Sequence, residues 1–206
     1  MRNYLVPLAV GCIGVIGSGC NLTQPYPAKD SFVLRAGAID QSPVKLPESV
    51  RVEPVRIAPP FDARSLVTRT GEVSFSRDYF NVFIAPPDEL ATAELIRLLT
   101  ESGVFTRVSG AGSAGTTDVS LECIVTDLYA DERNPANAVA VCRAKFRRLK
   151  NELGSTIVID DQMFESTAPI SSNSGEGIAA ALGQTFGATV KKYIDSVGAP
   201  PKKSGV

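Results

Sequence analysis

The sequence contains no histidine and no tryptophan in its 206 residues. Because histidine is absent, a Ser-His-Asp or Cys-His catalytic pair and any histidine-containing metal site are excluded. Cysteine is also scarce: if Cys20 carries lipid, as argued below, Cys123 and Cys142 remain beyond it, too few for a four-thiolate zinc site. We therefore expect no catalytic residue, no metal site and no cofactor.

Charge of one sign is not in excess. Removal of residues 1–19, which contain Arg2, leaves 187 of the 206 residues, with 20 basic against 22 acidic side chains and a formal charge of −2. A nucleic-acid groove requires a basic excess, so we expect no nucleic-acid partner. A chain of this length suffices for one domain with a substantial core.

Long apolar runs are missing except at the start. Arg2 is followed by an apolar run over residues 4–16 and by the small residues Gly17, Ser18 and Gly19. The run is too short to span a bilayer, which requires roughly 20 apolar residues. A basic start, an apolar stretch and small residues before a cleavage site are typical of a secretory signal, predicted here over residues 1–19.

Cys20 directly follows this signal, and the pattern resembles the bacterial lipobox, whose cysteine is acylated and becomes the first residue. Gly17 stands where the lipobox usually has leucine. Acylation at Cys12, or an ordinary secreted protein cut near Gly19, are the alternatives. Several acyl chains hold a domain on a membrane stably, at about 0.8 kcal/mol per buried methylene. Asn21, in place of an aspartate, favours the outer membrane over the inner membrane.

The rest of the chain predicts one α+β domain, with a mainly antiparallel sheet packed against two helices. Alternating and helical spacings of apolar residues, punctuated by proline and glycine, define the elements. In order we expect a lipidated tether at 20–30, a domain at 31–198 with strands near 31–35, 50–57, 66–69, 73–75 and 104–108, a helix at 87–102, long strands at 118–128, 138–149 and 155–167, a helix at 176–197, and a polar tail at 199–206.

Cys123 and Cys142 lie on the two strands predicted to form a long hairpin. A register that closes the hairpin between Glu132 and Arg133 places the two cysteines opposite each other, within reach of a disulfide. An oxidising periplasm favours that bond. The alternative is a pair of buried free thiols packed as small hydrophobic side chains.

Three other patterns carry little chemistry. The glycine-rich stretch 110–115 matches a dinucleotide fingerprint but is followed by a strand, so we interpret it as a loop. Asp160 and Asp161 are neighbours on a strand and point to opposite faces, which argues against a shared site. Alternating basic residues over 143–147 indicate a solvated outer face rather than a surface for anionic headgroups.

Several motifs, the most specific of them between residues 31 and 109, resemble the ABC-type transport auxiliary lipoprotein family, which includes the paraquat-inducible C lipoproteins. They are a lipobox-like cysteine, Phe-Val-Leu at 32–34, Val-Glu-Pro-Val-Arg-Ile at 52–57, Phe-Asp-Ala-Arg-Ser-Leu-Val-Thr-Arg at 61–69, Tyr79-Phe80, and Pro-Pro-Asp-Glu-Leu at 86–90 leading to Ser-Gly-Val-Phe at 102–105.

The resemblance implies a non-enzymatic lipoprotein of MCE-type lipid-trafficking systems. Its partners would be an MCE-domain protein and an ABC permease with its ATPase, contacted by a homo-oligomer on the periplasmic face of the outer membrane. Arg64, Arg69, Tyr79 and Phe80 are the candidate partner interface; pairing of the two arginines with carboxylates such as Asp62 is the alternative. The tryptophan that many relatives carry near Tyr79 is absent.

Two other functions remain open at this point. One is an outer-membrane assembly lipoprotein of the lipopolysaccharide-assembly type, which would bind a β-barrel instead of an MCE protein. The other is a periplasmic hydrolase that uses carboxylates alone, which requires two acidic groups converging in a pocket.

Overall fold

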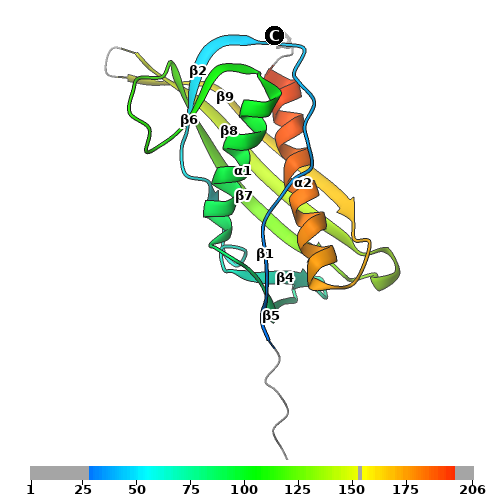
Figure 1. Cartoon of the computed structure of the whole chain (residues 1–206). Coiled ribbons are helices and arrows are strands. Elements are labelled where there is room, and N and C mark those ends of the chain that lie inside the picture. Colours follow the sequence, from blue (N-terminus) through cyan, green and yellow to red (C-terminus); the bar gives the residue numbers. More distant parts are fainter. Residues whose placement is uncertain (1–27, 153–154, 198–206) are drawn as a thin grey trace, which may run out of the picture.

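The computed structural model describes residues 28–152 and 155–197. The predicted signal, Cys20, most of the tether and the tail at 199–206 lie outside these residues. The described chain forms one sheet of nine strands and two α-helices (Figure 1). The elements are β1 Asp30–Phe32, β2 Leu46–Val52, β3 Arg56–Ile57, β4 Ser65–Arg69, β5 Phe75–Phe83, α1 Pro87–Ser102, β6 Phe105–Gly110, β7 Val119–Asp131, the 3-10 turn η1 Pro135–Asn137, β8 Val139–Glu152, β9 Ser155–Pro169 and α2 Gly175–Val197.

Strand β7 is the central strand of the sheet. Along one edge it pairs antiparallel with β8, which in turn pairs antiparallel with β9. Along its other edge β2, β3 and β4 follow one another, all parallel to β7. Pro54, Pro59 and Pro60 lack the N–H that a continuous ladder requires, so this edge is built from three short strands.

Two short extensions complete the sheet. At one end of β7, β6 pairs in parallel with β2; at the other end, β5 pairs antiparallel with β4 and in parallel with β1. The predicted α+β class is confirmed, and the longest ladders are antiparallel. The parallel pairs join segments far apart in the chain and were not expected from the sequence.

Both helices cover one face of the sheet (Figure 1). On β7 and β8 the side chains that point to this face are buried, as alternation predicts, and the ring of Phe146 stacks on Tyr193 of α2 with centroids 4.6 Å apart. Helix α1 begins with Pro87 in its first turn and ends at Gly103, whose φ of 61° is left-handed. Proline at the start and glycine after the end are the expected boundary signals.

Residues 33–37, which we call the crossing segment, leave the sheet after β1 and pass over the helices, so the first strand is shorter than predicted. Two glycines of α2 permit the approach. A Cβ on Gly183 would lie 2.6 Å from the carbonyl carbon of Arg35, and one on Gly187 would lie 2.5 Å from Cβ of Ala36. The close packing expected at these glycines is confirmed.

Helix α1 holds the crossing segment from the other side. The Glu94 carboxylate, only 4% exposed, accepts hydrogen bonds from the Ala36 N–H at 2.6 Å and from Arg97 at 2.6 and 3.0 Å. Arg97 also donates to the carbonyls of Ala36 and Gly37, each at 3.1 Å. By helical spacing alone Glu94 would face solvent, but the crossing segment covers that position.

The predicted register of the β7–β8 hairpin is also wrong. The last pair joins Asp131 to Val139, and the intervening loop contains the 3-10 turn Pro135–Asn137. The hairpin therefore closes around residue 135 rather than between Glu132 and Arg133. A bulge near Thr126 shifts the ladder further.

The change of register separates the two cysteines. Cys123 lies opposite Phe146, and Cys142 lies opposite Leu128. The four-residue offset along β8 corresponds to about 13 Å at roughly 3.3 Å per residue, whereas the Cα atoms of a disulfide lie within about 7 Å. Both thiols are buried and free.

Candidate functional site

Of the residues proposed as sites from the sequence, Cys20 lies outside the described part of the chain. The two candidate arginines are engaged within the domain. Arg64 donates from Nε to the Phe83 carbonyl at 2.8 Å, which ties β4 to the end of β5. The predicted alternative, pairing of the arginines with carboxylates such as Asp62, is not found among the described contacts of Arg64, but Arg69 lies 3.4 Å from the Glu72 carboxylate.

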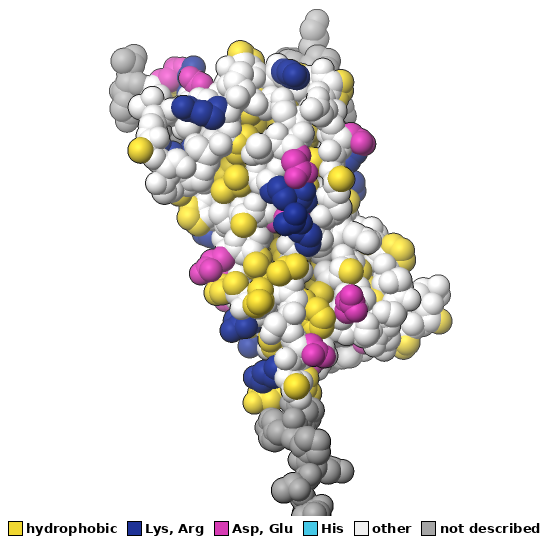
Figure 2. All heavy atoms as spheres, in the orientation of Figure 1, with side chains coloured by type: hydrophobic (Ala, Val, Ile, Leu, Met, Phe, Trp, Pro, Cys, Tyr) yellow, Lys and Arg dark blue, Asp and Glu magenta, His cyan; other side chains and the backbone are white. Residues whose placement is uncertain are grey.

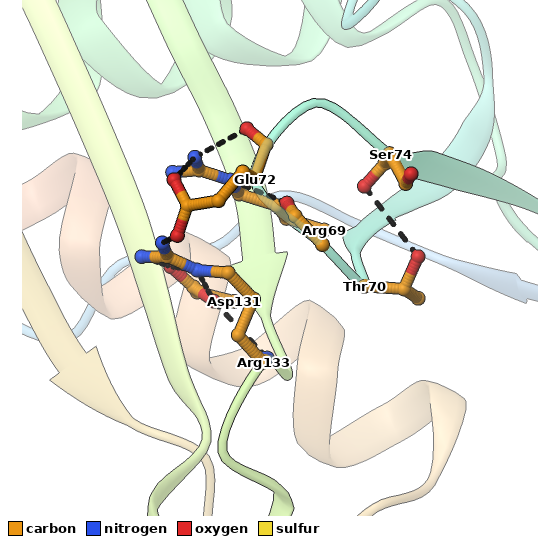
Figure 3. Close-up of polar contacts among 7 residues, drawn as sticks. Arg69, Thr70, Glu72, Ser74, Asp131 and Arg133 are labelled. Atoms are coloured by element: carbon orange, nitrogen blue, oxygen red, sulfur yellow. Dashed lines mark hydrogen bonds and ion pairs between the residues drawn. The ribbon is translucent and has the colours of Figure 1, made fainter.

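Arg69 fastens the β4–β5 turn (Figure 3). It donates to the carbonyls of Gly71 at 3.1 Å and Glu72 at 2.6 Å. The Glu72 carboxylate continues to Arg133 at 2.7 Å, and Arg133 pairs with Asp131 at 2.8 Å. Hydrogen bonds from Arg133 hold the pKa of Asp131 below its usual value. The network joins the β4–β5 turn to the β7–β8 turn, so Arg69 has a structural role here.

Unlike the two arginines, the two aromatic candidates are exposed. Tyr79 is 57% exposed and Phe80 39% exposed, and their rings form a T-shaped pair with centroids 5.2 Å apart. By contrast, Phe61 and Tyr129 stack in the domain at 5.6 Å, with Phe75 edge-on to both. The exposed pair contributes little to this core and remains available to something outside the domain.

A bulge in β5 produces this exposure. Between the pairs Ser65–Val82 and Val67–Arg77, β4 supplies one residue and β5 supplies residues 78–81. The surplus residues bend out of the ladder, as in any bulged strand. We call residues 78–81 the aromatic bulge.

The aromatic bulge is closed by hydrogen bonds to one carboxylate. Oδ1 of Asp78 accepts the backbone N–H groups of Phe80 at 2.8 Å and Asn81 at 3.0 Å, and Oδ2 accepts the Asn81 amide at 2.7 Å. Burial of this carboxylate raises the pKa of Asp78, but the hydrogen bonds from Asn81 and Phe80 outweigh it and lower the pKa from its usual value. Asn81 also packs against the start of α2, where a Cβ on Gly175 would lie 2.9 Å from Cβ of Asn81.

The described chain begins beside the aromatic bulge. Asp30 pairs with Asn81 at the start of β1, and Nζ of Lys29 lies 3.9 Å from the centroid of the Tyr79 ring. An ammonium over an aromatic face is an attractive cation–π contact. The N-terminal segment therefore enters the domain at the exposed aromatic pair.

The face of the sheet without helices carries a ladder of ion pairs. Arg143 pairs with Glu165, and Lys145 with Asp161 at 3.0 Å. Arg147 lies 3.5 Å from Asp161 and 3.4 Å from Glu122. Such partly exposed pairs contribute about 0–1 kcal/mol each. The row over 143–147 is a neutralised outer face, as interpreted from the sequence.

Arg148 follows this row in the sequence, but it points to the opposite face and is buried. Alternation along β8 places it on the same side as Phe146, where it pairs with Glu48 at 2.8 Å and Asp160 at 2.9 Å. Asp160 and Asp161 thus serve opposite faces, as predicted.

The edge strand β9 exposes a second group of apolar side chains. Ile157, Val158 and Ile159 are exposed near the β8–β9 turn, and Met163, 51% exposed, lies opposite Lys145 on the helix-free face. On its other side β9 has no strand partner within the described residues. Long edges of this kind are open to pairing with another chain.

A shallow groove of about 460 Å³ lies between β2, β7 and β8, lined by Glu53, Arg56, Glu122 and Asn151 among others. Of the two acidic residues in the lining, Glu122 has its carboxylate 3.9 Å from Arg56, in an ion pair. Its charged lining does not suit an acyl chain, which needs apolar walls.

The described residues contain no cluster of three or more His, Cys, Asp or Glu side chains arranged for a metal ion. Neither α1 nor α2 has the length and apolar character needed to cross a bilayer.

Known proteins resemble this chain in sequence and in fold. The family model for the ABC-type transport auxiliary lipoprotein component matches residues 32–192. A protein of Xanthomonas campestris, assigned to the DUF330 family model, has a similar fold with a TM-score of 0.69 and 15% identity, covering 81% of this chain and 95% of that one. A hypothetical protein of Chlamydia trachomatis shares the fold at a TM-score of 0.50 and 9% identity, covering 74% of this chain and 96% of that one.

A search of curated proteins found no match. The family match extends from β1 into α2 and includes the crossing segment, the aromatic bulge and the whole sheet. The chain therefore belongs to the family of ABC-type transport auxiliary lipoprotein components.

Proposed function

We propose that this chain is a non-enzymatic lipoprotein that assists an ABC permease, its ATPase and an MCE-domain protein in moving phospholipid across the periplasm. Acylated Cys20 anchors it to the periplasmic face of the outer membrane, with the inner membrane as the alternative. The observation that carries the proposal is the family match over residues 32–192, which identifies an auxiliary transport component.

The distribution of exposed apolar side chains supports different contacts at the two ends of the domain. The aromatic bulge lies where the N-terminal segment enters, at the lower end of the molecule in Figure 1, and the end of β8 and the start of β9 lie at the upper end. A domain anchored at the first end presents the second end to the periplasm. We assign partner contact to the helix-free face and to β9 with Met163.

The β9 edge also supports self-association. It offers a 15-residue strand with an unpaired side and the exposed apolar residues Ile157, Val158 and Ile159. A second copy that pairs with this edge would cover both the backbone groups and the apolar side chains. The measurement is the mass of the detergent-solubilised complex, which Ile157→Lys combined with Ile159→Lys should reduce.

In-cell photocrosslinking tests the partner. A photoreactive residue at Met163 should crosslink to the MCE-domain protein or to the permease, and one at Ile157 should crosslink to a second copy of the chain. The same group at Gln184, exposed on α2, is the matched control and should not. Mass spectrometry of the N-terminal peptide in the same sample should find Cys20 acylated.

Two outcomes would contradict the proposal. Capture of an outer-membrane β-barrel instead of MCE or permease components would indicate the assembly-lipoprotein alternative. An unmodified Cys20 would remove the anchor on which the orientation of the domain depends.

A further inference from the structure

The aromatic bulge is a feature that the proposed partner surface does not use. A Tyr and a Phe project from a strand in which residues 78–81 oppose one residue of β4. Neither ring is needed by the main aromatic cluster around Phe61, and both are exposed to solvent. Exposed aromatic pairs are costly to leave in water and commonly mark contact surfaces.

Contacts within the domain fix the conformation of the aromatic bulge without a binding partner. Asp78 fixes it through three hydrogen bonds of 2.7 to 3.0 Å, and Asn81 is packed against Gly175 at the start of α2. The rings therefore project from a rigid support and do not depend on a flexible loop. Preorganisation of this kind lowers the entropy lost on binding.

The position of the aromatic bulge near the N-terminal segment indicates what the two rings contact. Lys29, whose Nζ lies over the Tyr79 ring, is nine positions after Cys20 in the sequence. A chain of nine residues spans at most about 30 Å when fully extended. An acyl anchor at Cys20 thus keeps Tyr79 and Phe80 close to the bilayer to which the anchor belongs. In Figure 2, hydrophobic and basic side chains occur together at the lower end of the domain, where the chain enters.

We propose that Tyr79 and Phe80 insert into the lipid headgroup region and form a second membrane contact beside the acyl anchor. Aromatic rings are enriched at this depth because they combine an apolar body with a polarisable face, and the Tyr hydroxyl remains hydrated. The inference rests on the proposed anchor at Cys20. Its consequence is a fixed orientation of the domain relative to the membrane.

The surrounding charges argue for a contact with lipid that does not depend on anionic headgroups. Lys29 and Arg77 are basic, whereas Asp30 and Asp78 are acidic, so the charges around the rings balance. An electrostatic membrane site would need a cluster of basic residues. Salt should therefore leave the contact largely unchanged.

The absence of tryptophan allows a direct test in the acylated full-length protein, because Tyr79→Trp introduces the sole indole. The variant is incorporated into phosphatidylethanolamine and phosphatidylglycerol vesicles that contain lipids brominated near the headgroup. We expect a blue shift of the emission and strong bromine quenching. Phe80→Trp provides a second position if the first variant folds poorly.

Val158→Trp, at the end of the domain far from the aromatic bulge, is the matched control and should show no bromine quenching, whether or not a second copy covers the β9 edge. Asp78→Ala in the Tyr79→Trp background should weaken quenching, since it removes the hydrogen bonds that hold the aromatic bulge outward. Circular dichroism verifies that each variant is folded.

The outcomes separate the two proposals. If Cys20 is acylated and the protein floats with vesicles, but neither indole near the rings is quenched, the membrane contact is refuted and the anchor stands. Protection of the indole only after addition of an MCE-domain protein would likewise refute it in favour of a protein contact. If Cys20 is unmodified, the anchor fails, and quenching by added vesicles still decides whether the rings enter lipid.

Discussion

Substitution of Gly183 by alanine tests the close approach between α2 and the crossing segment. In a helix interior alanine is normally the better residue, by about 1 kcal/mol. Here, however, the new Cβ would lie 2.6 Å from the Arg35 carbonyl carbon and 2.9 Å from its nitrogen, inside the 3.4 Å at which ordinary contact begins. Backbone atoms cannot rotate away as a side chain can, so the whole segment must move.

The displacement required is about 0.8 Å or more, and it acts on the hydrogen bonds that hold the segment. The Ala36 N–H donates to Glu94 at 2.6 Å, and Arg97 donates to the Ala36 carbonyl at 3.1 Å. Each such bond to a charged group contributes roughly 1.5–3 kcal/mol. After subtraction of the gain in helix propensity, Gly183→Ala should lower the free energy of unfolding by about 2–4 kcal/mol. For a domain of this size that corresponds to a fall in Tm of roughly 5–15 °C.

Urea unfolding followed by circular dichroism provides the measurement. Gly112→Ala, in a loop where the added Cβ meets nothing within 4 Å, is the control. Gly187→Ala and Ala36→Gly form a double-mutant cycle. The Cβ added at position 187 would lie 2.5 Å from Cβ of Ala36, and Ala36→Gly removes that Cβ. The double variant should recover most of the loss caused by Gly187→Ala alone. A Gly183→Ala protein as stable as the unmodified chain, or more stable, would refute the close approach.

Three further predictions concern buried groups and pH. Burial raises the pKa of Cys142 to about 12 and the pKa of Cys123 well above its usual value. Both thiols should therefore resist alkylation at neutral pH until the protein unfolds, and dithiothreitol should leave Tm unchanged because the thiols are free. Alkylation of the native protein, or a Tm lowered by dithiothreitol, would contradict this prediction. Arg148→Met leaves the Asp160 carboxylate buried without its partner and should cost about 3 kcal/mol in urea unfolding; a neutral effect would show that the ion pair is dispensable. The pKa of Asp78 is lower in the folded state than the usual value of 3.8, so the ionised carboxylate stabilises the fold above that pH, and this stabilisation is lost as the pH falls through the folded-state pKa. Asp78→Asn should therefore reduce the dependence of the unfolding free energy on pH between about pH 5 and 2. An unchanged pH dependence would count against the hydrogen-bonded bulge.

Local signals in the sequence located the helices well. Pro87 and Gly103 mark the two ends of α1 because their backbone preferences act at the residue itself. Alternation likewise identified the buried face of β7 and β8. Gly183 and Gly187 pointed to a close contact, although the sequence did not reveal that residues 33–37 make it.

Features set by distant segments were missed. Glu94 has the spacing of a solvent-facing residue, and only the crossing segment buries it. Alternation along β8 places Arg148 on the side of Phe146, but its partners Glu48 and Asp160 come from other strands, which its neighbours in sequence do not specify. The cysteine register failed because η1 occupies the hairpin loop.

The candidate site could be predicted in part. Tyr79 and Phe80 were selected from the resemblance to the family, and both prove to be exposed. The bulge that exposes them had a weak local signal, since an aspartate side chain favours a hydrogen bond to the backbone two residues on, as Asp78 makes with Phe80. The structural roles of Arg64 and Arg69 depend on carbonyl groups whose positions the sequence does not give.

The route of the N-terminal segment determines how the domain responds to mechanical load. Strand β1 runs parallel to β5 and continues directly into the segment held between Glu94 and the α2 glycines. Tension applied at the N-terminal side therefore pulls along the axis of β1 and stresses its hydrogen bonds together, in shear, instead of peeling them one by one. The force then passes to both helices, so a load on the N-terminal side reaches the core of the domain before the chain can unfold from that end.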